Sequence, residues 1–225
     1  MNYVICSHKI TEKIEANLIN HGAVPVKLRG FGQFGESHPL CYHPDMFCFK
    51  SKKNKWVFYE GITHGLNIDA VTVKSPVSCV YPRDIGLNAA VVGDYLICNV
   101  KYTDETVLEH ADKIIDVKQG YAKCSVCMVD ENSIITSDAG IYSAAKKNNI
   151  EVLLISKGHI TLDGYNYGFI GGCSGLISKN KLAFTGSIAV HPDYEKIKKF
   201  CEGRGVEIVS LSNEKLYDYG SMFIV

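Results

Sequence analysis

One pattern of elements repeats along the whole chain: a short apolar strand, a polar turn, a second apolar strand, a helix and a third strand. Copies of this pattern begin at Asp45, Ala89, Ser125, Ser174 and Ser221. The copy at Ser221 stops after its first strand, but residues 3–28 supply the missing part in the same order. Counted through the termini, the five steps are 44, 36, 49, 47 and 49 residues and account for all 225 residues. The repeat therefore closes on itself.

Units of this kind cannot bury their apolar faces alone, so each must pack against its neighbours, and a ring leaves no end unpacked. The sequence therefore predicts an α/β fold in one domain, residues 1–225. The expected architecture is a five-bladed αβ propeller of ββαβ-type repeats, with the fifth repeat split between the C-terminus and the N-terminus. A three-layer α/β fold would use the same elements and is the alternative.

Capping residues and apolar spacing locate the helices. Thr11 begins one helix, in which Ile14, Leu18 and Ile19 are expected to face inward, and Gly22 ends it. Similar signals predict three more helices, which begin near Thr103, Asp138 and Pro192. Short runs rich in Val, Ile and Phe between turn residues predict the strands.

The charge balance narrows the class of partner. Lysine and arginine together number 24, as do aspartate and glutamate. Nucleic acids and anionic membrane surfaces are bound largely by clustered Lys and Arg, so we expect neither as a partner. The longest apolar runs are far shorter than the roughly 18 residues that cross a membrane, and the first residues lack a secretory signal. The nine cysteines then indicate reduced thiols, most of them in the core, and a cytoplasmic protein.

Equivalent repeats in a ring bring the starts of their first strands to the axis. The residues at or next to these positions include His43, Asp45, Asn88, Cys124 and Cys173. A thiol becomes a nucleophile when a base or a cation lies nearby, and histidine is the usual base near neutral pH. The set suits covalent catalysis, and the alternative for Cys124 and His43 is a structural role in the core. Thiolate zinc sites usually need four ligands and the chain has a single Cys-x-x-Cys pair, so we expect no metal.

Two segments resemble one enzyme superfamily. The segment Cys41–Phe49, which contains His43 and Asp45, resembles the His-x-Asp strand of arginine deiminases and the corresponding His strand of dimethylarginine dimethylaminohydrolases (DDAH). The segment Ala122–Val129 resembles the strand that carries their nucleophilic cysteine, and Cys124 follows His43 by two repeats, as in those enzymes. They are penteins, guanidino-group-modifying proteins whose fold is a five-bladed αβ propeller with a central active site.

The resemblance implies a role for each residue. Cys124 would attack a guanidinium carbon, His43 would move protons to the leaving amine and from the hydrolytic water, and Asp45 would hold a guanidinium nitrogen by charge-assisted hydrogen bonds. It also implies a small-molecule substrate and no cofactor. Cys173, which lies two repeats from His43 in the other direction, is the rival nucleophile.

One departure from the family pattern bears on function. The acidic motif that clamps the substrate should lie three repeats after the histidine, where residues 169–175 contain no carboxylate. Asp84 is a candidate second acid, Arg83 a candidate ligand for a substrate carboxylate, and Asn88 a further candidate for substrate binding. The sequence leaves the oligomeric state open.

Two hypotheses follow from these residues. The first is a hydrolase or transferase that acts on the carbon–nitrogen bond of a guanidine- or amidine-like small molecule. The second is a non-catalytic pentein that serves as a binding scaffold, as the ribosome anti-association factors of this fold do. The His-x-Asp strand and the placement of Cys124 favour the first, and the missing acidic motif favours the second.

Overall fold

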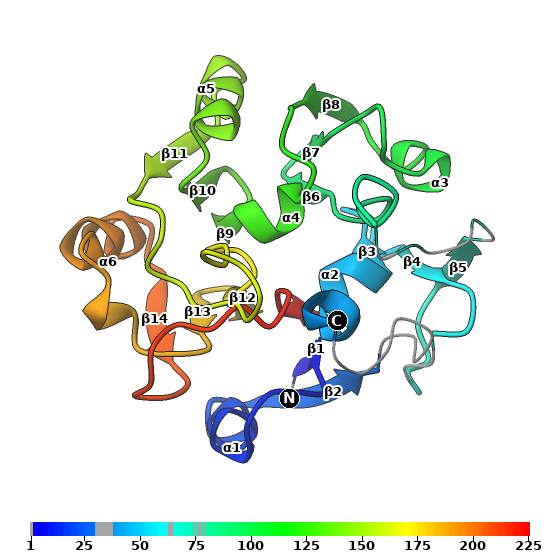
Figure 1. Ribbon diagram of the computed structural model, residues 1–225. Coiled ribbons are helices and arrows are strands. Elements are labelled where there is room, and N and C mark those ends of the chain that lie inside the picture. Colours follow the sequence, from blue (N-terminus) through cyan, green and yellow to red (C-terminus); the bar gives the residue numbers. More distant parts are fainter. Residues whose placement is uncertain (1, 30–37, 63–64, 74, 76–77, 79) are drawn as a thin grey trace.

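The computed structural model describes residues 2–29, 38–62, 65–73, 75, 78 and 80–225. Its strands form five three-stranded sheets around a common centre (Figure 1). The sheets are β3–β4–β5 (Cys48–Lys50, Trp56–Tyr59, Ala70–Val73), β6–β7–β8 (Ala90–Val92, Tyr95–Cys98, Lys113–Asp116), β9–β10–β11 (Cys127–Asp130, Ser133–Thr136, Glu151–Leu154), β12–β13–β14 (Ser174–Ser178, Lys181–Phe184, Glu207–Ser210) and β15–β1–β2 (Phe223–Ile224, Asn2–Ser7, Ala23–Leu28). The five-bladed α/β ring is the architecture that the repeat predicts.

All five sheets have the same topology. The first strand pairs antiparallel with the second, so that Ala90 of β6 lies opposite Ile97 of β7. The second strand pairs parallel with the third, so that Ile97 lies opposite Ile115 of β8. A parallel pair needs a long crossover, usually a helix. The crossovers of four sheets contain α1 (Glu12–Asn20), α3 (Glu105–Leu108), α5 (Ala139–Lys147) and α6 (Tyr194–Glu202), which lie at the rim of the ring (Figure 1).

The split repeat is confirmed by the sheet that contains both ends of the chain. β15 pairs antiparallel with β1, with Val4 opposite Ile224 and Ile5 opposite Phe223. β1 in turn pairs parallel with β2 over six residue pairs. This sheet completes the ring, because β15 supplies the first strand of a blade whose other two strands come from the start of the chain.

The helix signals in the sequence are largely confirmed. Thr11 caps α1 by accepting a hydrogen bond from the amide of Ile14, and Asp138 caps α5 in the same way. Two expectations were wrong in detail. Ile19 is 51% exposed rather than turned inward, because the inner face of this nine-residue helix is filled by Ile14 and Leu18. The helix expected to begin near Thr103 is α3, a single turn capped by Asp104, one residue later than expected.

Short helical turns, and not strands, occupy two of the five central positions. The turns α2 (Pro44–Phe47) and α4 (Ala122–Ser125) precede β3 and β9, so these strands begin at Cys48 and Cys127. Proline at the first position of α2 favours the turn because its φ is already helical and the amide it lacks would have no helical partner. The first-strand starts expected at Asp45 and Ser125 are therefore wrong by two or three residues.

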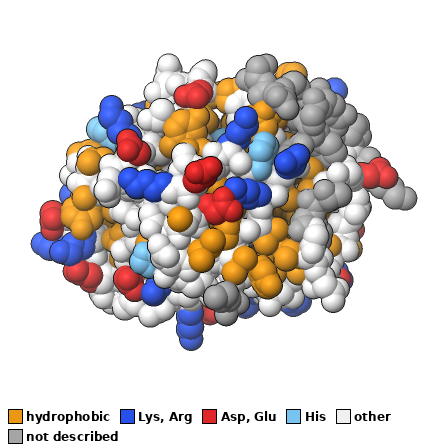
Figure 2. Space-filling model, turned by 90° about the horizontal axis from the view of Figure 1, so that it is seen from below, with side chains coloured by type: hydrophobic (Ala, Val, Ile, Leu, Met, Phe, Trp, Pro, Cys, Tyr) orange, Lys and Arg blue, Asp and Glu red, His pale blue; other side chains and the backbone are white. Residues whose placement is uncertain are grey.

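Apolar side chains between the blades form the core. The largest fully buried side chains are Trp56, Phe47, Phe49 and Phe184. The cysteines in the described part of the chain are buried and form no disulfide with one another, as the composition predicts. Within that same part, no helix is long and apolar enough to cross a membrane. Viewed along the plane of the ring, the flank shows basic and acidic side chains interspersed with apolar ones (Figure 2).

Candidate active site

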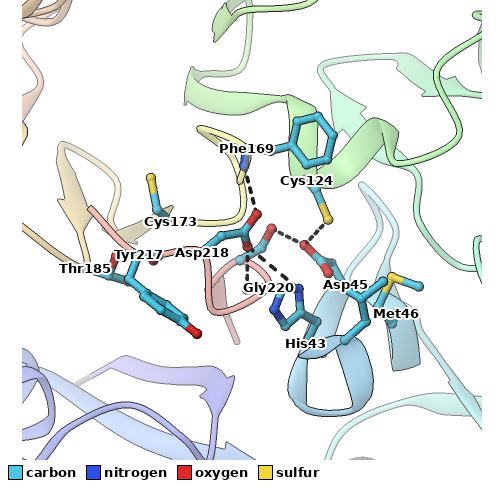
Figure 3. Close-up of polar contacts among 12 residues, drawn as sticks. His43, Asp45, Met46, Cys124, Phe169, Cys173, Thr185, Tyr217, Asp218 and Gly220 are labelled. Atoms are coloured by element: carbon cyan, nitrogen blue, oxygen red, sulfur yellow. Dashed lines mark hydrogen bonds and ion pairs between the residues drawn. The ribbon is translucent and has the colours of Figure 1, made fainter. Parts of the chain in front are cut away.

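The two central helical turns carry the predicted histidine, aspartate and cysteine. His43 is the residue just before α2, Asp45 lies within α2, and Cys124 lies within α4. Their exposed fractions are 3%, 0% and 2%. One side-chain ligand atom of each residue lies within 4.8 Å of the others. The structure therefore brings together the three residues that the sequence places in one column (Figure 3).

Asp45 connects the cysteine to the loop before β15. The Cys124 thiol donates a hydrogen bond to Asp45 Oδ2 at 3.0 Å, and the Ser221 hydroxyl donates to the same oxygen at 2.6 Å. The other oxygen, Oδ1, is buried and has no hydrogen-bond partner among the described residues. A buried carboxylate oxygen without a donor is unfavourable, so Asp45 retains one unused acceptor beside Cys124 and His43.

A second carboxylate that the sequence did not reveal faces the histidine. Asp218 is 1% exposed, and its Oδ1 lies 3.7 Å from His43 Nδ1. The backbone amides of Phe169 and Gly220 donate to its two oxygens at 2.8 and 3.0 Å. These donors fix the carboxylate beside His43 (Figure 3). The sequence could have indicated Asp218, since it comes directly before the Tyr219-Gly220-Ser221 column position. By the family pattern, the second substrate-binding acid was expected in a different repeat, at residues 169–175.

Gly220 allows the loop of Asp218 to approach the histidine. Its φ is +84°, a left-handed conformation that favours glycine. A Cβ at this position would lie 2.3 Å from both Cα and Cβ of His43. The Gly220 carbonyl also accepts a hydrogen bond from the amide of Asp45 at 3.1 Å. The position therefore needs glycine for both its backbone conformation and its close contact with His43.

Asn88 holds the two helical turns together. Its Nδ2 donates to the Asp45 carbonyl at 3.1 Å and lies 3.2 Å from Cys124 Sγ. Its Oδ1 accepts from the amides of Lys123 and Cys124 at 2.8 and 3.3 Å. Both ends of a side chain that is 1% exposed are therefore engaged by the protein. These contacts make Asn88 a positioning residue for Asp45 and Cys124, and its expected contact with substrate stays a prediction.

Burial controls the charges of these groups. Burial, with the neighbouring carboxylate of Asp45, raises the pKa of the Cys124 thiol well above its usual range. Burial lowers the pKa of His43 and raises the pKa of Asp45, and in each case the other partner of the pair opposes the shift. Burial also raises the pKa of Asp218 to about 6. Near neutral pH the site therefore contains a protonated thiol, a neutral imidazole and an ionised Asp218.

A pocket of about 240 Å³ leads to these residues. His43, Cys124 and Asp218 lie in its wall, and its other lining side chains are mainly aromatic and aliphatic: Leu40, Tyr121, Leu162, Tyr165, Tyr167 and Phe169, with Asn166. The rings of Tyr121 and Phe169 are tilted against each other with centroids 6.1 Å apart. A small molecule in the pocket would contact the cysteine, the imidazole and a carboxylate at once.

The remaining predicted site residues lie outside the pocket lining. Asp84 is buried behind Tyr121, whose hydroxyl donates to Asp84 Oδ2 at 2.6 Å. Arg83 is exposed and is not among the described residues that line the pocket. Cys173 is fully buried, its thiol donates to the Ile170 carbonyl at 3.3 Å, and its sulfur points away from Asp218 (Figure 3). Neither Arg83 nor Cys173 lines the pocket with His43, and Asp84 supports Tyr121.

One group of side chains in the described part of the chain could bind a metal ion. His43, Asp45 and Cys124 each offer one donor atom at mutual separations that a single ion could bridge. A nitrogen, an oxygen and a sulfur ligand suit zinc, with a fourth position left for water or substrate. The expectation of no metal, which came from the spacing of the cysteines, stays a prediction.

Three solved structures have a similar fold. DDAH from Pseudomonas aeruginosa, a cysteine-to-serine mutant complexed with citrulline, matches with a TM-score of 0.58 at 9% identity, over 99% of this chain and 98% of that chain. C. jejuni agmatine deiminase matches with a TM-score of 0.52 at 11% identity, over 99% and 92%. SxtG, an amidinotransferase from Microseira wollei in the saxitoxin biosynthetic pathway, matches with a TM-score of 0.50 at 8% identity, over 98% and 89%.

These matches span almost the whole chain, so the protein has the pentein fold. No curated protein matches the sequence. A family model covers residues 5–223, and the chain belongs to that family, the family of unknown function DUF6873.

Proposed function

We propose that this protein is a cysteine-dependent hydrolase or transferase that acts on the carbon–nitrogen bond of a small guanidine or amidine. The observation that supports the proposal most strongly is that Cys124, His43 and Asp218 line one pocket, with Asp45 buried beside Cys124 and His43. The pentein neighbours add support, because two are named as a deiminase and an amidinotransferase. We also expect a cytoplasmic protein with a small-molecule substrate.

One carboxylate in the pocket wall, Asp218, and a second buried beside Cys124, Asp45, favour a cationic ligand. Asp218 is held in place by two backbone amides, and Asp45 has one oxygen without a hydrogen-bond partner among the described residues. A guanidinium or amidinium offers N–H donors in one plane and carries the opposite charge, so it suits two convergent carboxylates. Asp218 thus supplies the second acid whose absence from residues 169–175 favoured a non-catalytic scaffold.

The proposed first half-reaction forms a carbon–sulfur bond and breaks a carbon–nitrogen bond. Cys124 Sγ attacks the electron-poor carbon, and its proton passes through His43 to the departing nitrogen, which leaves as an amine. The product on the enzyme is an S-linked amidinium cation. Because the resting thiol is protonated, the positive charge of the bound substrate is needed to favour the thiolate. The cysteine is then activated mainly when substrate is present.

The second half-reaction regenerates the thiol. His43 takes a proton from a water molecule, the oxygen bonds to the carbon, and the carbon–sulfur bond breaks as Cys124 recovers a proton. A guanidine substrate then yields a urea and an amine. An acceptor amine in place of water gives a transferase with the same residues.

A pair of related electrophiles tests the proposal. Chloroacetamidine carries the planar cation that the two acids favour, and chloroacetamide is its neutral analogue. We expect chloroacetamidine to label Cys124 much faster than chloroacetamide does, and we expect Asp218→Asn to reduce this preference, as measured by mass spectrometry of the labelled peptide. Equal rates for the two reagents in the wild-type protein would contradict a cation-binding catalytic site.

The alternative is a binding scaffold in which the same residues form a buried polar network. The high pKa of the Cys124 thiol and its hydrogen bond to Asp45 favour this alternative. In that case Cys124→Ser would keep any partner binding, and no guanidine or amidine would leave an adduct on Cys124. An S-linked adduct on Cys124, trapped after incubation with a set of guanidines, would favour the enzyme over the binding scaffold.

A further inference from the structure

A second cavity lies at the other end of the five central strands. Its volume is about 290 Å³. Each sheet contributes a residue of its first strand to the lining: Lys50 of β3, Val91 of β6, Met128 of β9, Leu176 of β12 and Ile224 of β15. Residues 51, 52, 54, 93 and 131 of the hairpin turns line the cavity on one side. The candidate active-site pocket is lined instead by residues that come before these strands, so the two cavities lie at opposite ends of the strands.

The helical turn α4 forms part of the partition between the two cavities. Cys124 lines the candidate active-site pocket, and its neighbour Lys123 lines the second cavity. The two side chains leave α4 in different directions because successive residues of a helix differ by about 100° around its axis. Asn88, which accepts hydrogen bonds from the amides of both residues, holds this partition in place.

The second cavity combines apolar walls with two half-buried ammonium groups. Lys50 Nζ donates to the Ile224 carbonyl at 2.7 Å, and burial lowers the pKa of Lys50. Lys123 Nζ lies 5.0 Å from the centre of the Phe223 ring. The ion pairs found among the described residues include neither of these lysines. Partly buried cations without an anionic partner favour an anion that enters the same space.

The charges and walls of the cavity define the kind of ligand. We propose that this second cavity binds a small amphipathic carboxylate, with its carboxylate at Lys50 and Lys123 and its apolar body against Val91, Met128 and Leu176. The volume is near the lower end for cavities that hold small molecules, roughly 300 Å³, so the ligand is a medium-chain or single-ring acid. Glu131, the one acid in the described lining, lies on an exposed turn and does not neutralise both lysines.

The experiment uses octanoate as the probe and its neutral analogue octanamide as the chemical control, with binding to the full chain measured by titration calorimetry. We expect octanoate to bind and octanamide to bind at least tenfold more weakly. Lys123→Met keeps the apolar stem and removes the charge, and we expect it to weaken octanoate binding at least tenfold. Lys50→Met should act in the same direction. Lys147→Met, which removes an exposed charge from the rim helix α5, should leave the affinity unchanged.

Three results would overturn the proposal. The first is absence of octanoate binding to the folded wild-type protein at millimolar concentration. The second is equal affinity for octanoate in wild type, in Lys123→Met and in Lys50→Met. The third is loss of octanoate binding in Tyr167→Ala, a change in the wall of the candidate active-site pocket, which would place the probe there instead. None of these results bears on whether Cys124 is catalytic, so this proposal and the proposed function fail separately.

Discussion

Replacing Asp45 with asparagine should make Cys124 more reactive. Asp45 Oδ2 lies 3.0 Å from the sulfur and accepts its proton in a hydrogen bond. The charge of Asp45 adds to burial in raising the pKa of the Cys124 thiol. Asparagine removes that charge with little change in shape, so Asp45→Asn should lower the thiol pKa and increase the thiolate fraction near neutral pH.

The distance gives the size of the effect. Two unit charges 3.0 Å apart interact with about 5 kcal/mol at an effective dielectric constant of ~20. The carboxylate disfavours the thiolate by up to this amount, and every 1.4 kcal/mol that Asp45→Asn removes raises the thiolate fraction about tenfold. The lower basicity of the sulfur reduces its intrinsic reactivity about threefold for each such step. We therefore expect labelling of Cys124 at least about threefold faster.

The assay is alkylation with iodoacetamide, followed residue by residue with mass spectrometry. Asp84→Asn is the matched control, because Asp84 is also a buried acid but does not contribute to the pKa of Cys124. The buried thiols of Cys127 and Cys173 serve as internal references. Labelling of Cys124 in folded Asp45→Asn at or below the wild-type rate would refute the idea that Asp45 keeps the thiol protonated.

Three further predictions concern stability and geometry. The pKa of Asp218 is raised from 3.8 to about 6. The free energy of unfolding of the wild type, relative to that of Asp218→Asn, should therefore be highest below about pH 4. It should fall by about 3 kcal/mol as the pH rises from there through 6. Urea denaturation across pH measures this, and a pH-independent difference would argue against a buried, titrating Asp218. Gly220→Ala should unfold more easily than Gly205→Ala by about 2 kcal/mol, since both have positive φ but only Gly220 touches another residue, His43, closely; equal urea midpoints would contradict this contact. Asn88→Ala leaves two amides of α4 without their acceptor and should cost about 3 kcal/mol, whereas a cost within about 0.5 kcal/mol, typical of surface changes, would show that Asn88 is not needed to hold the helical turns.

The ring could be predicted from the sequence because its signal is local and repeated. Each blade needs the same short apolar runs, polar turns and capped helix, so five weak signals support one another, and the partial copy at Ser221 continues at residue 3. Equivalence of the repeats then places His43, Asp45 and Cys124 at the centre without any knowledge of loop shape. This is why the sequence was sufficient to bring these three residues together.

Other features of the site depend on conformations that no local pattern specifies. Asp218 reaches His43 only because the loop turns at Gly220, whose backbone is left-handed, and because the amides of Phe169 and Gly220 point at the carboxylate. Asn88 can hold Asp45 and Cys124 in place because α2 and α4 are helical turns where strands were expected. Such details follow from close packing among segments far apart in the chain.

The ionisation of the site is likewise a property of the folded molecule. The sequence identifies a cysteine, a histidine and an aspartate, and each has an ordinary pKa in an unfolded chain. Burial at the centre of the ring favours the neutral form of the groups it surrounds, since a charge loses more solvation there than it regains from one neighbour. The sequence therefore determines which groups meet, and the tertiary structure decides which of them carry charge.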